Sequence, residues 1–241
     1  MPATFSAANR SWWDHDAQNY HQSHSEYLSS FYWCPEMLHE KDAQLLGDVT
    51  GKHILEIGCG SAPCTQWLQD KAELAVGFDL SMGMLRHGSG NLVQADALAM
   101  PFADNSFDAV FSAFGAIPFV ESSQAVLHEA ARVLQPGGRF VMSINHPMRW
   151  IFADDPESFA VHYSYFDRSG YTEEEDGRLT YAEQHRTLGD RIRELLAAGF
   201  VLEDLLEPEW PADLKQNWGQ WSPTRGRVFP GTAIFLAHLG S

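Results

Sequence analysis

The chain has 241 residues, of which 44% are hydrophobic, so it can bury one substantial α/β core, whereas two full domains would each be small. Its 32 acidic and 16 basic residues give a formal net charge of -16, which would repel a phosphate backbone and argues against a nucleic-acid partner. The longest apolar run, residues 109–120, is shorter than the ~20 residues of a membrane span, so we expect a soluble, cytoplasmic protein without a membrane span.

The cysteines and histidines do not predict a metal centre. Cys34, Cys59 and Cys64 are too few and too unevenly spaced for a disulfide framework or a structural zinc site. No pair of histidines has a spacing on a defined element that compels metal binding. We therefore expect reduced thiols and no metal.

The first 35 residues are rich in aromatic side chains and histidine, which bury a large area wherever they find a surface. These residues are Trp12, Trp13, His15, Tyr20, His21, His24, Tyr27, Tyr32 and Trp33. Two interpretations stay open, a helical strut on the sheet edge and a flap over the ligand. The next stretch, residues 35–46, has the apolar spacing of an amphipathic helix, with proline in its first turn and Gly47 at its end.

Residues 53–79 have the pattern of one β-loop-α-β unit. An apolar run at 54–57 leads into Gly58-Cys59-Gly60, a helix follows, and a second apolar run ends at Asp79. Glycines at a strand edge let a ligand approach bare backbone, a helix N-terminus carries partial positive charge, and an acid after the next strand can accept ribose hydroxyls. The stretch predicts a ligand that contains a nucleoside.

Strands and helices continue to alternate after this unit. Ser81 can cap a helix that runs to His87, and strands are expected at residues 91–95, 107–111 and 139–144, with a helix at 122–134. The strand at 91–95 ends at Asp96, so two successive strands end in an acid. Such alternation predicts a doubly wound parallel sheet whose ligand crevice lies at the carboxyl ends of its strands.

Two aromatic stretches interrupt the alternation in the second half of the chain. Residues 145–186 are interpreted as a lid insertion, and residues 207–230, which contain three tryptophans, as a second insertion. Between them a helix at 188–198 and a strand at 199–206 are expected, and a last strand at 232–239. We expect a single domain over residues 1–241, with a flap at 1–35, a cofactor-binding core at 36–144, and a C-terminal part at 187–241.

Four segments, in order, resemble the class I methyltransferases that use S-adenosylmethionine, in the methyltransferase type 11 branch that includes ubiquinone and menaquinone C-methyltransferases. The segments are ILEIGCGSA at 54–62, VGFDLS at 76–81, ADALAMPFADNSFDAVFS at 95–112 and HEAARVLQPGGRFVMSI at 128–144. The resemblance implies a Rossmann-like sheet of seven mostly parallel strands with the last strand antiparallel. It also implies S-adenosylmethionine as cofactor and a small-molecule methyl acceptor.

The resemblance assigns one group of residues to the methionine end of the cofactor. Gly58 and Gly60, with Cys59 between them, would pass under the methionine moiety, and Glu56 would lie near its ammonium group. Ser112, after the fourth strand, would lie where the methyl donor faces the substrate.

A second group is assigned to the nucleoside. Asp79 would bind the ribose hydroxyls, Leu80 and Met84 would flank the adenine, and Asp96 with Ala97 would reach the adenine edge.

Two other functions remain as alternatives. A nicotinamide oxidoreductase also joins a glycine turn to a strand-end acid, but its fingerprint has a third glycine where this chain has Pro63. A cofactor-binding protein without transfer activity is compatible with every motif, because binding residues do not certify chemistry.

Methyl transfer from a sulfonium is an in-line displacement, in which alignment alone can supply ~7–11 kcal/mol of the barrier, so a base is not obligatory. The candidates for a catalytic base are His146, directly after a strand, and His185, before the late helix, since an imidazole titrates near ~6.5.

Arg149 and Arg168 are interpreted either as partners of an anionic substrate or as surface ion pairs. The aromatic residues of the insertions form either an acceptor pocket or plain packing, and a homodimer is one possible assembly.

Overall fold

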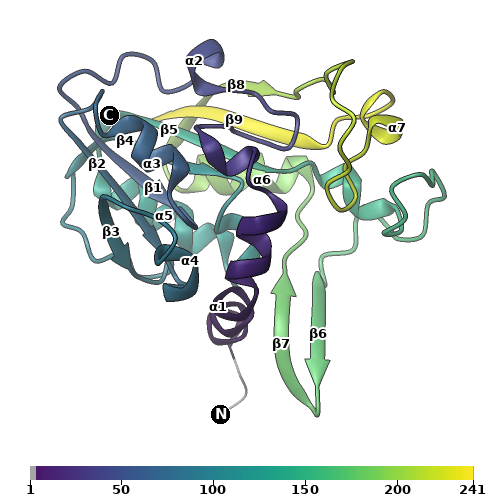
Figure 1. Ribbon diagram of the computed structural model, residues 1–241. Coiled ribbons are helices and arrows are strands. Elements are labelled where there is room, and N and C mark those ends of the chain that lie inside the picture. The colour runs from purple at the N-terminus through teal and green to yellow at the C-terminus, as the bar shows by residue number, and fades with distance from the viewer. Residues whose placement is uncertain (1–3, 241) are drawn as a thin grey trace.

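The computed structural model describes residues 4–240, and its centre is one seven-stranded sheet with the strand order β3-β2-β1-β4-β5-β9-β8 (Figure 1). Strands β1 to β5 pair in parallel, and β9 is antiparallel to both of its neighbours. The bounds are β1 His53–Ile57, β2 Leu74–Asp79, β3 Asn91–Gln94, β4 Phe107–Ala113, β5 Leu134–Asn145, β8 Phe200–Leu206 and β9 Thr232–Leu239. The predicted mostly parallel sheet with an antiparallel last strand is confirmed.

The central strands are apolar on both faces because each face is covered by a separate core. Along β5, Phe140 and Met142 face one core while Val141 faces the other, as the two-residue period of a strand requires. The first core contains side chains of α5 (Ser123–Val133) and α6 (Leu188–Ala197), and the second contains side chains of α3 (Pro63–Leu68). The result is a three-layer α/β arrangement.

Side-chain caps fix the starts of several helices. The Ser81 hydroxyl accepts from the N–H of Met84 at the start of α4 (Met82–Leu85), and Ser122 caps α5 in the same way. Thr187 and Asp190 form a reciprocal capping box on α6. The α5 and α6 helices predicted from the sequence are therefore present, with their starts set by local chemistry.

The helix predicted for residues 35–46 is wrong. Only α2 (Glu40–Ala43) is helical, and the backbone turns through positive φ angles at Met37 and Gln44. The reason is Glu40, a buried carboxylate that accepts hydrogen bonds from Trp33 Nε1 and from the backbone N–H groups of Leu45 and Leu46. A folded loop, rather than a helical face, places the apolar side chains of this stretch in the second core.

The N-terminal segment divides into two parts. Helix α1 (Phe5–Ser23) lies outside the sheet layers, alongside α4 and β7, and a short helix η1 (Tyr27–Ser29) follows it (Figure 1). Phe31 and Trp33, by contrast, are fully buried in the second core. The part that can act as a flap is therefore α1, while the end of the segment belongs to the core.

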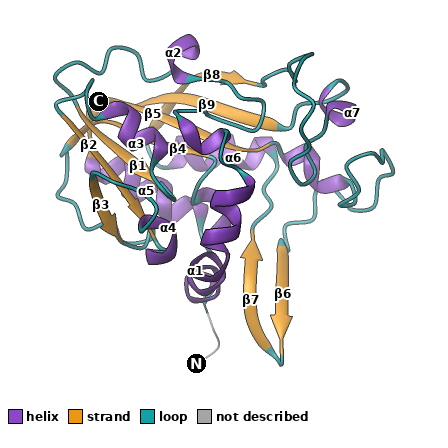
Figure 2. Cartoon of the chain, viewed as in Figure 1, coloured by secondary structure: helices purple, strands orange, loops and turns teal. Residues whose placement is uncertain are grey.

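The first insertion forms a separate two-stranded sheet of β6 (Tyr171–Glu175) and β7 (Arg178–Glu183), which extends away from the main sheet (Figure 2). Three short helices complete the fold: η2 (Ile117–Phe119) follows β4, η3 (Pro147–Ile151) begins the first insertion, and α7 (Pro223–Gly226) lies in the second. The buried guanidinium of Arg225 donates to the carbonyls of Ala153, Asp155 and Ser158, which ties the second insertion to the first. Within residues 4–240, no helix has the length and apolar character needed to cross a membrane.

Candidate functional site

A cavity of about 710 Å³ lies where the carboxyl ends of the parallel strands meet, the edge at which the ligand crevice was predicted. Its floor contains Glu56 at the end of β1, Asp79 at the end of β2 and Ala113 at the end of β4. Its other walls come from α1 and from the two insertions, the first of which contains β7. The volume is typical of a site for a cofactor together with a small molecule.

The glycine turn after β1 is folded tightly against the sheet. The N–H groups of Gly58 and Cys59 both donate to the carbonyl of Phe78, and Gly58 and Gly60 have φ angles of +69° and +56°. A Cβ on Gly58 would lie 2.5 Å from the backbone nitrogen of Ala116. Gly58 is thus required by the close approach of the loop after β4 as well as by its own backbone conformation.

The two strand-end acids are both at the cavity wall. The Asp79 carboxylate accepts from the N–H of Gly60 and of Ser81, each at 2.8 Å, and Asp96 accepts from the N–H of Leu98. Burial raises the pKa of Asp79, and these N–H groups oppose that shift by stabilising the carboxylate. Each carboxylate keeps acceptor capacity for a ligand.

Glu56 completes the polar floor. It is 2% exposed, and its Oε2 accepts from both the N–H and the hydroxyl of Thr65. Burial raises the pKa of Glu56 to about 7, against the effect of those hydrogen bonds. The remaining predicted cofactor residues on the cavity wall are Cys59, Leu80, Met84 and Ala97.

The other end of the cavity is built by the extension of β7. Tyr181, Glu183 and His185 line the cavity while the residues between them do not, which is the alternation of an extended strand. Arg149 of η3 lies across from this row, with Nη2 3.3 Å from Glu183 Oε2. This end therefore combines aromatic walls with a buried ion pair and a histidine.

His185 is 2% exposed, and its Nε2 lies 2.8 Å from the carbonyl oxygen of Tyr165. Because a carbonyl only accepts, Nε2 carries the hydrogen, and Nδ1 has no hydrogen-bond partner within the described part of the chain. Burial lowers the pKa of His185, and the nearby guanidinium groups of Arg191, Arg168 and Arg186 lower it further. The ring is therefore neutral at neutral pH.

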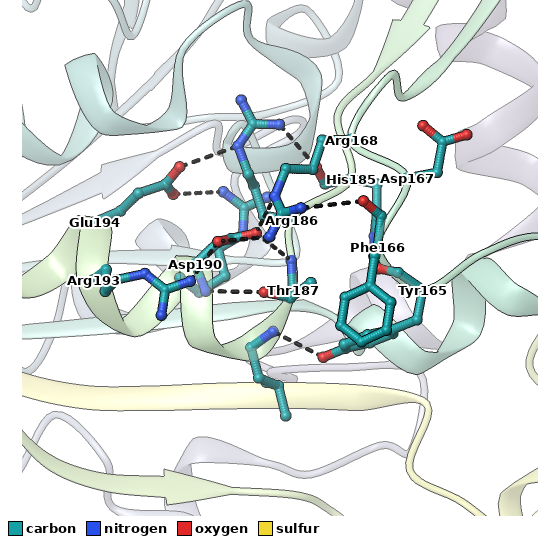
Figure 3. Close-up of polar contacts among 12 residues, drawn as sticks. Tyr165, Phe166, Asp167, Arg168, His185, Arg186, Thr187, Asp190, Arg193 and Glu194 are labelled. Carbon is teal, nitrogen blue, oxygen red and sulfur yellow. Dashed lines mark hydrogen bonds and ion pairs between the residues drawn. The ribbon is translucent and has the colours of Figure 1, made fainter.

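Figure 3 shows how the region around His185 is held. Arg168 and Arg193 both bind the carboxylate of Asp190, and Arg186 binds Glu194. The Tyr165 hydroxyl accepts from the N–H of Leu188 at the start of α6. The first insertion is thereby fixed to α6 around the histidine.

Two predicted site residues do not line the cavity. Ser112 is fully buried, and its hydroxyl donates to the carbonyl of Ile57, because β4 continues to Ala113 and the cavity begins at that residue. His146 turns the other way: its Nδ1 caps η3 by accepting from the N–H of Met148, and its Nε2 lies 2.8 Å from Glu207 Oε1. The structure thus separates His146 from His185.

Several residues at the β7 end of the cavity, called the acceptor end below, were not predicted as site residues. Glu183 is the clearest, and the spacing Tyr181, Glu183, His185 is a signal in the sequence, since alternate residues of a strand share a face. Trp12 and Trp13 of α1 also line the cavity. Their helix could be predicted as a flap, but no pattern indicated which of its side chains point inward.

Residues 55–142 match the protein family described as "Methyltransferase domain". The matched residues run from β1 into β5 and include the glycine turn and both strand-end acids. The chain is 41% identical over 95 residues to a demethylmenaquinone methyltransferase of Corynebacterium kroppenstedtii, covering 38% of this chain and 41% of that protein. It is 36% identical over 108 residues to that of Renibacterium salmoninarum, covering 42% and 45%. The chain thus spans less than half the length of these curated relatives.

Solved structures confirm the fold of residues 55–142 and of the strands beyond them. A putative S-adenosylmethionine dependent methyltransferase from Listeria monocytogenes matches with a TM-score of 0.68 and 22% identity, over 84% of this chain and 96% of that one. An S-adenosylmethionine dependent methyltransferase from Mesorhizobium loti matches with a TM-score of 0.64 and 23% identity, over 83% and 97%.

The residues of the cavity floor fit S-adenosylmethionine as cofactor. Asp79 and Asp96 present carboxylate oxygens for hydroxyl and amino groups, and the buried Glu56 presents one for an ammonium group. The glycine turn between Glu56 and Asp79 has no side chain at Gly58 or Gly60 to fill the space beside it. All of these groups face one cavity.

Proposed function

We propose that the protein transfers a methyl group from S-adenosylmethionine to a small-molecule acceptor. The observation that carries the proposal is the continuity of the cavity, which runs from the acids at the strand ends to the aromatic end beside β7. One space can therefore hold the methyl donor and an acceptor in contact. Separate pockets would have favoured a binding protein without transfer activity.

The residues of the floor would bind and orient the donor. We assign the ribose hydroxyls to Asp79, the adenine edge to Asp96 with Ala97, the adenine faces to Leu80 and Met84, and the methionine ammonium to Glu56. The sulfonium of the bound cofactor supplies an electrophilic methyl carbon. Helix α1 forms one wall of the cavity, and the contribution of the protein is mainly alignment.

We propose that His185 accepts the proton when the acceptor atom has one to lose. Its ring lines the cavity and is neutral at neutral pH. Its Nδ1 has no partner among the described residues but is itself buried, so it would reach an acceptor only when the side chain or the lid moves. The Tyr165 carbonyl would hold the tautomer that leaves Nδ1 free to accept. The structure offers no such arrangement for His146, which engages Met148 and Glu207 outside the cavity.

The acceptor end suits a flat molecule, because Trp150, Trp221 and Tyr181 contribute aromatic faces.

We further propose the organisation expected from the sequence: a single domain in which α1 acts as the flap and residues 145–186 as the lid. The charge of -16 supports a protein that does not bind nucleic acid, and we place it in the cytoplasm. We also propose a homodimer, which sedimentation of the purified protein tests.

Calorimetric titration with S-adenosylmethionine, S-adenosylhomocysteine and NAD tests the proposal. We expect the first two to bind and NAD not to bind. Asp79→Ala should weaken binding by ~1.5–3 kcal/mol, the range for a lost charged hydrogen bond. Asp70→Ala, an exposed acid outside the cavity, is the matched control and should bind as the native protein does.

Turnover separates an enzyme from a binding protein. Incubation of metabolite pools with cofactor carrying a labelled methyl group should transfer the label to a small molecule. Preferential binding of NAD, or cofactor binding without transfer to any component of the pools, would contradict the proposed function.

A further inference from the structure

Arg149 is the one positively charged residue among those that line the acceptor end of the cavity, in the part of the chain that the structure describes. Its side chain is only 14% exposed. The guanidinium lies 5.2 Å from the ring centre of Trp150 and 4.9 Å from that of Trp221. These rings hold its position through cation–π contact.

The guanidinium is incompletely bound. Its Nε donates to Gln220 Oε1 at 3.1 Å and its Nη2 to Glu183 Oε2 at 3.3 Å, and no bond to a described residue is made by Nη1. Removing a guanidinium from water is costly unless its N–H groups are matched by acceptors. A single carboxylate contact of this length leaves donors available to a ligand in the cavity.

Other guanidinium groups near this end are already engaged. Arg168 binds Asp190 in a forked arrangement and Arg186 binds Glu194, as Figure 3 shows. Of the two arginines that the sequence offered as partners of an anionic substrate, Arg168 is therefore a surface ion pair and Arg149 faces the cavity.

Glu183 contacts Arg149 through one oxygen only, at 3.3 Å. Burial raises the pKa of Glu183, which Arg149 only partly opposes. This single contact leaves the guanidinium fork open for a bidentate contact with a second carboxylate.

The carboxylates at the rim of the cavity act in the opposite direction but less strongly. Asp154, Asp167 and Glu173 line the rim and are exposed, so solvent screens their charge. Asp154 also binds the Gln220 amide, and Glu173 accepts from the Tyr171 hydroxyl. At the rim a cationic acceptor would meet screened charges, whereas an anionic group would meet a guanidinium that is largely withdrawn from solvent.

We propose that Arg149 binds a carboxylate of the methyl acceptor, which makes the acceptor an aromatic carboxylic acid. The planar guanidinium fork matches the geometry of a carboxylate, and the neighbouring tryptophan and tyrosine rings accommodate a flat body. This inference rests on the proposed function, because it assigns a substrate class to the same site.

Binding of three small probes to the complex with S-adenosylhomocysteine tests the assignment. The probes are 4-hydroxybenzoate, its uncharged analogue 4-hydroxybenzamide and the cationic 4-hydroxybenzylamine, each measured by calorimetric titration. The acid should bind at least about tenfold more tightly than the amide, since charged hydrogen bonds are lost in the amide. Arg149→Met should remove this preference while the amide affinity and the affinity for S-adenosylhomocysteine stay unchanged.

Two further variants make the result specific. Arg149→Lys keeps the charge but loses the fork, so an intermediate preference is expected. Arg193→Met removes a guanidinium that is 69% exposed, and it should keep the full preference. Tighter binding of the amine, equal binding of acid and amide, or binding of none of the probes overturns the inference. Failure of S-adenosylhomocysteine itself to bind contradicts the proposed function instead.

Discussion

The burial of Glu56 makes cofactor binding sensitive to pH. Its pKa is raised to about 7 by burial, so the carboxyl group is mostly uncharged in the free protein below that pH and ionised above it. An ionised Glu56 attracts the methionine ammonium, so affinity should rise as pH increases through about 7. Binding to the protonated form releases one proton from Glu56, so the affinity changes by at most about tenfold per pH unit.

Titration of the protein with S-adenosylhomocysteine between about pH 5.5 and 7.5 measures this effect, in a range where the ligand ammonium keeps its charge. Glu56→Gln should flatten the pH dependence, with an affinity close to that of the native protein at the acidic end. A variant that keeps the native pH dependence would show that another group, such as Asp79, controls the affinity.

His185 makes a different prediction, because its pKa is lowered rather than raised. The neutral ring is present at neutral pH and is lost only as the pH falls below the ordinary range for histidine. Methyl transfer should therefore be constant around neutral pH and decline on the acidic side. His185→Gln should reduce the rate constant by roughly 10²–10⁴, the range for general acid–base catalysis, without changing cofactor affinity.

His146→Gln is the comparison variant, since His146 is equally buried but lies outside the cavity. It should lower stability through the loss of the η3 cap and leave the rate constant unchanged. If His146→Gln slows transfer and His185→Gln does not, the assignment of the two histidines is reversed.

At the scale of single residues, the sequence was informative where a motif and a strand end coincide. Glu56, Gly58 and Asp79 are placed by strands whose apolar runs are evident, so their positions followed from the pattern. The same pattern does not predict the direction of a side chain. Ser112 also lies near the end of a strand, yet its hydroxyl donates to the carbonyl of Ile57 and does not reach the cavity. Arg149 lies in an insertion whose path no periodicity specifies.

At the scale of elements, alternation predicted the sheet, and local chemistry decided the exceptions. The expected helix at residues 35–46 failed because Glu40 binds the backbone of its own loop, a competition that apolar spacing does not reveal. The hairpin of β6 and β7 has a turn signal in its sequence, Asp176-Gly177 between two strand-like runs. Both residues have positive φ angles, as a type I′ turn requires. This turn signal predicts a strand directly after Gly177, and Glu183 lies at the end of that strand.

At the scale of the whole molecule, the cavity is closed by segments that are distant in the sequence, and Asn9 joins them. This residue of α1 is 1% exposed. Its Nδ2 donates to the carbonyls of Phe119 and Ala182, and its Oδ1 accepts from the N–H of Ala182 on β7. Further along α1, Asp14 accepts from Ser81 and from Gly83 at the start of α4. Helix α1 is thus held at two points across the cavity that it covers.

Asn9→Ala should release one of these points and leave the N–H and carbonyl of Ala182 without a partner. We expect a loss of ~1–3 kcal/mol in stability and faster hydrogen exchange in α1 and β7, with exchange in β1 and β4 unchanged. Cofactor affinity should fall as well, because α1 lines the same cavity. Asn19→Ala on the same helix is the matched control, since Asn19 is exposed and bonds only to Asp16. Exchange that rises equally in the central strands would mean that Asn9 stabilises the whole fold, and α1 would then not be a separately closing flap.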